Sequence, residues 1–448
     1  MLTTILMLTI GLAAAACDDT GEAMPGDDAG HPPDGMDAGP APGDDAGTDA
    51  ATPAEDGGPG EGDDAGSPGP TERLTPDDFT YRGAFRLPDA FTWSSLGITV
   101  RPDGDGGDGT LFVLGKSRQP AQLSEVSIPD PAIAPFDELP VAEIRMTPRS
   151  MDGDLIESTL SADHTDARGL LYVPQTGSQD SAHLYGAADY WYAVMDGTFP
   201  TIWMSELDGS DPRGLFHVGP EGDSTFHGNR TGDYLFSVPE WYAARYLGGR
   251  RVVAGKTRGA FGGSMGPTMF AFPRFDTEEP SGDLDALPML YYPLVDECAG
   301  PNRGDPDVCD FPQFSMCDKW TGAAFVEEGD RRAIVLYGIK GVGNEYGPPS
   351  SPDACNPYQG YHCDPLTLQL LFYDVDEIGD AATGGRDPWS VAPYRVWQPD
   401  GLFSPDADGH SCGPPGGMTH DPATGRLFLV ERGLGAEDEA SVHVFSTR

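Results

Sequence analysis

Residues Gly417–Glu431 have the sequence GMTHDPATGRLFLVE. Two short apolar segments flank a turn made of Asp, Pro, Thr and Gly, which is the pattern of a β-hairpin. The same pattern occurs four more times, as GITV…TLFVLG from Gly97, STLS…LLYVP from Ser158, STFH…DYLFSVP from Ser224 and GAAF…RRAIVLYG from Gly322. Five copies of one strand pair indicate a repeated structural unit.

A third apolar strand follows each hairpin, starting at Gln122, Thr201, Thr268, Leu368 and Ser441. Each unit is therefore an antiparallel meander, and repeated meanders of this length predict an all-β fold, a β-propeller. The intervals before the last two copies are wide enough for degenerate units, so we expect six or seven blades. Phe79–Leu87 is a spare strand that we expect to complete the last blade. A β-sandwich is the structural alternative.

Composition supports this fold class and excludes others. The 60 glycines and 43 prolines disfavour long helices, because glycine weakens helix interiors and proline breaks them. The 72 acidic residues outnumber the 27 basic ones and give a formal net charge of -45. We expect no nucleic acid partner, since such binding requires a cationic surface.

The N-terminus predicts export. Residues 1–16 contain the apolar run Ile5–Ala16, which is too short to span a bilayer but matches the core of a signal peptide. The following Cys17 completes LAAAAC, which resembles a bacterial lipobox, although no Lys or Arg precedes the run. We therefore expect lipidation of Cys17, a membrane as partner through this anchor, and an extracytoplasmic location in the cell envelope.

Residues 17–72 are almost entirely Asp, Gly, Ala, Pro, Glu and Thr, with DDAG repeated at Asp27, Asp44 and Asp63. Such a segment buries too little apolar surface to offset the entropy lost on ordering, so it predicts a disordered linker. The propeller domain is then expected over residues 73–448.

The remaining cysteines form one group, and an even number in an exported chain indicates disulfides. Zinc is the competing interpretation, but no CxxC pair occurs and the spacings do not fit it. The sequence allows several pairings, and one of them is Cys298–Cys309, Cys355–Cys363 and Cys317–Cys412.

Four motifs carry a resemblance to a family: YRGAFRLP at Tyr81, GGSMGP at Gly262, KGVGNEYG at Lys340 and GYHC at Gly360. Over most of residues 79–446 the chain resembles a group of exported bacterial β-propeller lipoproteins without a settled activity. The resemblance implies the fold more than a function. The chain lacks the tryptophan-docking repeat of quinoprotein dehydrogenases and any WD pattern.

Long loops on a rigid scaffold are where binding sites are commonly built. In this chain the long connections lie between second and third strands, so the sequence predicts a site on that face. The candidate acid–base groups are His362, His410 and Glu345, and the candidate ligand-binding residues are Arg118, Glu240, Asp318, Trp320 and Lys340. The alternative is that His362 only neighbours a cysteine pair and that Lys340 and Glu345 are solvated.

Other polar motifs are interpreted as turns. His164, His227 and His420 fall at the short hairpin turns and are expected to be turn residues. The run Asp103–Asp108 does not match an EF-hand loop and predicts a polar turn. Gly262–Pro267 precedes a strand and therefore lacks the helix N-terminus of a phosphate site. GxSxG, HExxH and phosphate-loop motifs are absent.

Two functions remain open. The first is a lipid-anchored propeller that binds a ligand or an envelope partner through its long-loop face. The second is an extracytoplasmic metal-assisted hydrolase or lactonase at the central channel, with carboxylates holding a divalent ion and His362 or His410 as acid–base groups. No cofactor is predicted with certainty, and Ca²⁺ is the candidate for the second function. Fold does not separate the two, because propellers perform both roles.

Overall fold

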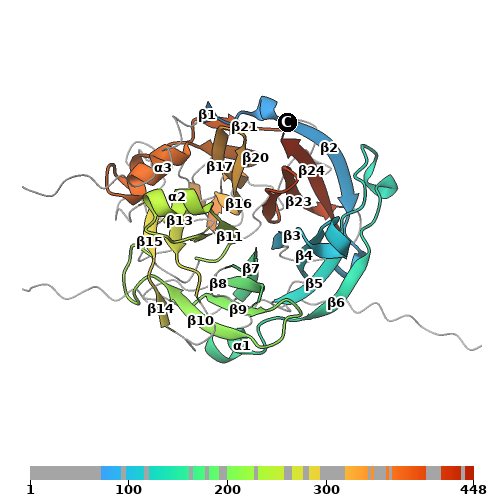
Figure 1. The fold of residues 1–448 in the computed structure, drawn as a ribbon, viewed down its shortest axis with the longest axis horizontal. Coiled ribbons are helices and arrows are strands. Elements are labelled where there is room, and N and C mark those ends of the chain that lie inside the picture. Colours follow the sequence, from blue (N-terminus) through green and yellow to red (C-terminus); the bar gives the residue numbers. More distant parts are fainter. Residues whose placement is uncertain are drawn as a thin grey trace, which may run out of the picture. The chain divides into compact units, whose positions relative to one another are not determined.

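The computed structural model divides the chain between Gly66 and Ser67, and the second unit, Ser67–Arg448, is compact. It describes residues within the second unit, namely 72–91, 97–115, 121–160, 165–176, 181–190, 199–226, 231–256, 265–275, 282–292, 318–341, 345–347, 360–362, 366–399, 415–434 and 439–447. In Figure 1 the sheets of this unit are arranged around a central axis.

The described residues form a β-propeller of five antiparallel blades. Blade 1 contains β3 (Ile98–Arg101), β4 (Thr110–Gly115), β5 (Gln122–Ser127) and β6 (Ile144–Ser150). Blade 2 contains β7 (Thr165–Val173), β8 (His183–Tyr190), β9 (Ile202–Glu206) and β10 (Arg213–Val218), with β14 (Gly282–Leu284) added in parallel at its edge. Blade 3 contains β11 (Tyr234–Ser237), β12 (Val252–Gly255), β13 (Met265–Phe272) and β15 (Leu287–Tyr292).

Blade 4 contains β16 (Lys319–Glu328), β17 (Arg331–Gly341), β20 (Leu366–Tyr373) and β21 (Arg395–Trp397), and β1 (Glu72–Arg73) pairs with the start of β17. Blade 5 contains β22 (Met418–Asp421), β23 (Arg426–Leu434), β24 (Glu439–Thr447) and β2 (Phe79–Arg86). The elements outside the blades are α1 (Leu155–Thr159), α2 (Glu240–Tyr246), α3 (Val375–Ala382) and the small hairpin of β18 (Glu345–Gly347) and β19 (Gly360–His362).

The two ends of the domain close the ring. β2 pairs antiparallel with β24, from Phe79 opposite Thr447 to Arg86 opposite Ser441. The prediction that Phe79–Leu87 completes the last blade is therefore confirmed. Pairing of the two termini covers the edge that β24 would otherwise expose to other chains.

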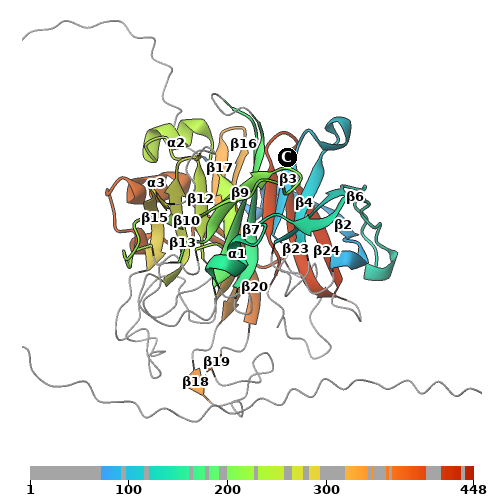
Figure 2. The ribbon, with the colours of Figure 1, turned by 90° about the horizontal axis from the view of Figure 1, so that it is seen from below.

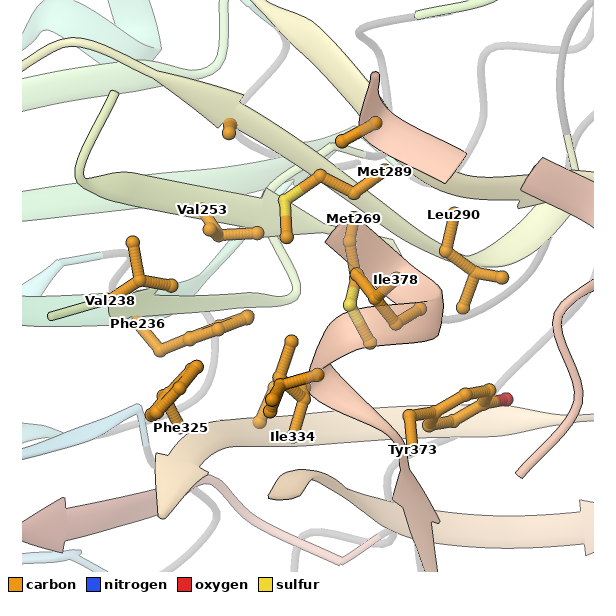
Figure 3. Close-up of a cluster of buried hydrophobic side chains, with 14 of the residues drawn as sticks. Phe236, Val238, Val253, Met269, Met289, Leu290, Phe325, Ile334, Tyr373 and Ile378 are labelled. Carbon is orange, nitrogen blue, oxygen red and sulfur yellow. The ribbon is translucent and has the colours of Figure 1, made fainter. Parts of the chain in front are cut away.

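Hydrophobic clusters fill each interface between neighbouring blades, including the one between blade 5 and blade 1. In β17, Ile334 and Leu336 pack toward blade 3, whereas Val335 and Tyr337 pack toward blade 5. Figure 3 shows the cluster between blades 3 and 4, with Phe236 and Phe325 facing each other. Burial on both faces explains why this strand is a continuous apolar run rather than an alternating one.

Two of the repeat copies are divided into strands differently than expected. LLYV lies in β7 and LFS lies in β11, and both are the first strands of their blades. Their second strands are β8 and β12, and α1 occupies part of the stretch expected to be a strand from Ser158. The third strands lie where they were predicted, as β5, β9, β13, β20 and β24.

The described residues form five blades, fewer than the six or seven expected. The described part of the wide interval between β17 and β23 contains the β18–β19 hairpin, β20, α3, β21 and β22, and these elements do not form a further blade. Part of the interval between β12 and β17 is taken by β14, which joins blade 2.

The first strands of the blades lie close together around the axis. The Gly169 amide donates to the Gly232 carbonyl at 2.8 Å, which links β7 to the residues before β11. A Cβ on Gly169 would lie 2.9 Å from that carbonyl oxygen, so this approach requires glycine. The Thr99 hydroxyl accepts from the Tyr172 amide at 2.9 Å, and the Thr419 hydroxyl accepts from the Val100 amide at 3.3 Å. In addition, the Thr321 hydroxyl of β16 donates to the Gly416 carbonyl just before β22 at 2.8 Å, so hydrogen bonds cross four of the five boundaries between the inner strands β3, β7, β11, β16 and β22.

Several predictions fall outside the described residues. The predicted signal peptide, Cys17 and nearly all of the predicted linker lie there, as do the six candidate disulfide cysteines, Cys298, Cys309, Cys317, Cys355, Cys363 and Cys412. Among the described helices, none has the length and apolar character needed to cross a membrane.

Candidate functional site

The blades have two distinct faces. On one face, called the hairpin face below, lie the turns after β3, β16 and β22 and the helix α2. On the opposite face, called the loop face, β17 ends and the β18–β19 hairpin follows. Figure 2 shows α2 and β18–β19 at opposite ends of the blades.

A cavity of about 380 Å³ lies among the inner strands on the hairpin face. Its size is within the range of small-molecule sites, roughly 300–1,000 Å³. All five inner strands contribute to its wall, together with residues that flank β12 and β13. The lining residues are Thr99, Val100, Pro102, Leu171, Tyr172, Pro174, Leu235, Phe236, Ser237, Val238, Pro239, Arg251, Arg274, Ala323, Ala324, Phe325, Glu327, Met418, Thr419, His420 and Pro422.

Four buried polar atoms of this wall have no hydrogen-bond partner among the described residues. They are Ser237 Oγ, Arg251 Nε, Arg274 Nε and His420 Nε2. Buried polar atoms in folded proteins are normally bonded, and leaving one without a partner costs about 1–3 kcal/mol. Their concentration around one cavity makes this cavity the candidate binding site.

Two of these atoms belong to neighbouring guanidinium groups. Arg251 immediately precedes β12, and Arg274 follows β13 in the same blade. Arg274 donates to the Thr176 hydroxyl. Burial and, to a lesser degree, repulsion from Arg251 lower the pKa of the Arg274 guanidinium. The two cations therefore lie close to each other in a partly desolvated wall.

Nearby carboxylates neutralise this cationic wall only in part. Glu327 lines the cavity, but its Oε1 lies 2.5 Å from Arg332 Nε, so its charge is already paired. Glu240 Oε2 lies 3.6 Å from an Arg251 nitrogen, and the Glu240 side chain is 85% exposed. An exposed pair of this kind contributes little, about 0–1 kcal/mol. Arg274 has no carboxylate partner among the described residues.

His420 supplies a neutral group on the opposite side of the wall, in β22. Burial lowers its pKa to about 4, and the charges of Asp421 and Glu328 oppose that shift. The Phe325 backbone likewise opposes the shift, and the buried Nε2 has no hydrogen-bond partner among the described residues. A neutral imidazole carries one donor and one acceptor nitrogen, so Nε2 can bond to a polar group of a molecule in the cavity.

The residues predicted from sequence lie mainly on the loop face. Asp318 is fully buried and accepts hydrogen bonds from Lys340 Nζ at 2.9 Å and from the Gly341 amide at 3.2 Å. This pair joins the entry to β16 with the end of β17. Trp320 is fully buried in the cluster between blades 3 and 4. None of these predicted residues lines the cavity.

The other predicted residues are placed differently or lie outside the described residues. Glu345 and His362 face each other in the β18–β19 register, and His362 is buried. Glu240 begins α2, between the first and second strands of blade 3, and so belongs to the hairpin face rather than to a second-to-third loop as expected. The error follows from taking LFSV as a second strand. Arg118 and His410 are outside the described residues.

The interpretation of Asp103–Asp108 as a polar turn is confirmed, because these residues connect β3 to β4. Asp105 pairs with Arg145 at 2.9 Å, and Asp103 pairs with Arg101 at 3.1 Å. In the ranges that the structure describes, no group of three or more His, Cys, Asp or Glu residues is placed to hold a metal ion.

Sequence reasoning missed the residues of the cavity. It interpreted His420 as a turn residue, and it did not select Ser237, Arg251 or Arg274. One signal was present: inner strands are followed by proline, as Pro102, Pro174, Pro239 and Pro422, all of which line the cavity. Proline has no amide donor for a ladder, and its recurrence marks the strand ends that surround the cavity.

Comparison with known proteins adds little. No protein-family model matches the chain. No curated protein matches its sequence. Among solved structures, the chain is similar to the α-L-arabinofuranosidase Arb93A from Fusarium graminearum, in complex with an iminosugar inhibitor. The similarity covers 78% of this chain and 82% of that chain, with 9% sequence identity and a TM-score of 0.33. At this level it carries neither activity nor site residues over to this chain.

Proposed function

We propose that this chain is an exported β-propeller, held at a bacterial membrane by a lipid on Cys17, that binds a small ligand in the cavity on its hairpin face. The observation that carries the proposal is the group of four buried polar atoms without partners around that cavity. A ligand that bonds to them would remove a cost of about 1–3 kcal/mol for each atom.

This proposal moves the binding site away from the loop face that the sequence favoured. Lys340 and Asp318, the loop-face candidates with described side chains near the axis, already bond to each other. Much of the chain between β12 and β16 and between β21 and β22 lies outside the described residues. Ligand binding by Arg118, Glu240, Asp318, Trp320 and Lys340 therefore stays a prediction.

The test is a titration of residues 18–448 with N-phenyl-1-naphthylamine, a neutral dye whose fluorescence rises in apolar sites. We expect saturable binding to the wild-type chain and loss of binding in Ser237→Trp, because the indole would occupy the cavity. Glu157→Gln, an exposed change in α1, is the matched control and should bind like the wild type. Equal dye binding by Ser237→Trp and by the wild type would contradict the proposal.

The hydrolase alternative makes a different prediction. A metal ion that binds only the folded chain raises its stability, by about 2.7 kcal/mol at a hundredfold excess over the dissociation constant. Melting curves with calcium and with excess chelator should coincide for the binding protein. A clear rise with calcium would favour the hydrolase instead, and lactones and esters would be the substrates to assay.

The lipid anchor is tested separately in cells. The wild-type chain should partition into the detergent phase and gain the mass of a lipid at its N-terminus. Cys17→Ser should appear in the aqueous phase without that mass. Detergent partitioning of Cys17→Ser equal to that of the wild type would contradict the anchor.

A further inference from the structure

We propose that the ligand of the hairpin-face cavity is an organic carboxylate with an apolar ring or branched body, bound through Arg251 and Arg274. This inference rests on the proposed function and names the chemical class of its ligand. It depends on three features of the wall, which are the charge of the two arginines, the apolar surface, and the polar side formed by His420.

The charge comes from the two arginines of blade 3. Each has a buried Nε without a partner among the described residues, and the carboxylate that acts on both is the exposed Glu240, 3.6 Å from Arg251. Guanidinium groups match carboxylates in a planar, two-point geometry, and such charge-assisted bonds are about twice as strong as neutral ones. A cationic ligand would instead be repelled by both groups.

The apolar surface of the wall favours an organic anion over a bare inorganic one. Most of the wall is hydrocarbon, supplied by Val100, Leu171, Leu235, Phe325 and Met418 among others. Sulfate or phosphate would fill the cationic side and leave this surface in contact with water. An apolar ring or branch buries it, with a gain of roughly 25 cal/mol for each Å² removed from water.

The second polar side lies away from the arginines, on blade 5. His420 Nε2 is buried without a partner among the described residues. It would exchange a hydrogen bond with a hydroxyl on the body of the ligand, which can both donate and accept. A hydroxyl-bearing carboxylate therefore satisfies more of the wall than a plain one.

The overall charge of the chain does not prevent anion binding. The formal net charge is -45, but solvent-exposed charges are screened beyond about 8 Å at physiological ionic strength. Charges in the cavity wall act over shorter distances and across less water, so they dominate the affinity.

The experiment compares 1-naphthoate with 1-naphthamide, which share a ring system and differ in charge, by titration calorimetry on residues 18–448 at pH 7. We expect the acid to bind at least about tenfold more tightly than the amide. Arg274→Gln and Arg251→Gln should each weaken acid binding by about tenfold and change amide binding less than about twofold. Arg245→Gln, which removes one exposed charge in α2, is the matched control and should change neither.

Each outcome has a separate meaning. Equal affinity for the two compounds, both lost in Ser237→Trp, would overturn the carboxylate inference while the proposed function stands. Acid binding that persists in Ser237→Trp would place the compound elsewhere and overturn the inference. Absence of binding by both compounds would overturn it too, and the dye titration would then decide the proposed function on its own.

Discussion

Arg168 provides a contrast to the arginines of the cavity. It reaches Asp233 at 2.9 Å, Asp166 at 3.0 Å and Asp189 at 3.4 Å, and both Asp189 and Asp233 are almost completely buried. Burial lowers the pKa of the Arg168 guanidinium, but the three carboxylates outweigh it, so the pKa is raised. Because three carboxylates already pair with Arg168, its charge stabilises the fold. Arg274, in contrast, has no carboxylate partner among the described residues.

We expect Arg168→Met to destabilise the domain by about 3–5 kcal/mol, because it leaves the buried Asp189 and Asp233 without their shared cation. Chemical denaturation at pH 7 measures the loss. Arg149→Met is the control, since Arg149 pairs with Asp208 at 4.0 Å and both side chains are at least half exposed. That pair should contribute within about 1 kcal/mol. Equal effects of the two substitutions would contradict a structural role for Arg168.

His420 predicts a pH dependence of stability. Its pKa is about 4 in the folded chain, below its usual value of 6.5, because burial disfavours the charged ring. Between these values the unfolded chain binds more protons, so stability falls as the pH is lowered from 6.5 toward 4. The full effect is up to about 3 kcal/mol. The free energy of unfolding should depend less on pH in this window for His420→Gln than for the wild type, and parallel curves would contradict the assignment.

At the scale of elements, sequence patterns located strands better than they assigned them to blades. The third strands and β2 were predicted, since their apolar runs are bounded by clear turn residues. LLYV and LFSV were assigned to second strands, because ADHTDARG before the first and GNRTG before the second have the same turn chemistry as true hairpins. Local turn chemistry does not tell whether the preceding residues pair, which depends on the rest of the blade.

The cavity could not be predicted in the same way. Arg251 and Arg274 flank different strands of blade 3, and His420 comes from blade 5. These residues line one cavity because the blades are arranged around a common axis, and no local spacing encodes that arrangement. A polar residue after an inner strand has the same local pattern whether it lies in a turn or lines a cavity.

Bonds between inner strands should stabilise the centre of the ring. The Thr99 hydroxyl accepts from the Tyr172 amide of the neighbouring blade. Thr99→Val keeps the shape of the side chain but removes this acceptor, so we expect a loss of about 1–3 kcal/mol. Thr147→Val, in the exposed strand β6, is the control and should change stability by less than about 0.5 kcal/mol. Denaturation curves compare the two, and a Thr99→Val effect as small as the control would contradict the role of this bond.

At the scale of the whole molecule, stability depends on closing the ring. Each blade buries both faces against its neighbours, and the last interface, between blades 5 and 1, contains Phe85 and Leu87 from β2 and the residues just after it. Phe79 packs in the interface between blades 4 and 5. One short segment near the start of the chain therefore contributes to two of the interfaces while it covers the edge of β24.

A pair of truncations separates the contribution of this segment from that of the N-terminal unit. A chain beginning at Ser67 keeps every described strand. We expect its free energy of unfolding to lie within about 0.5 kcal/mol of that of residues 18–448. A chain beginning at Asp89 lacks β2, Phe79, Phe85 and Leu87. Truncating one buried Phe to Ala costs about 3–5 kcal/mol. Removing two of them is comparable to the whole stability of a domain, about 5–15 kcal/mol.

The shorter chain should therefore lose its cooperative melt and aggregate through the exposed edge of β24. A peptide of residues 72–88 added in trans should restore the melt by pairing with that edge, as in β-strand addition. Cooperative unfolding of the shorter chain without the peptide would mean that the ring is stable when open, because the interfaces between consecutive blades would then suffice. Rescue by the peptide would instead show that β2 is the segment that closes the ring. A peptide with Phe85→Ala should restore the melt less well, because it leaves a gap between blades 5 and 1.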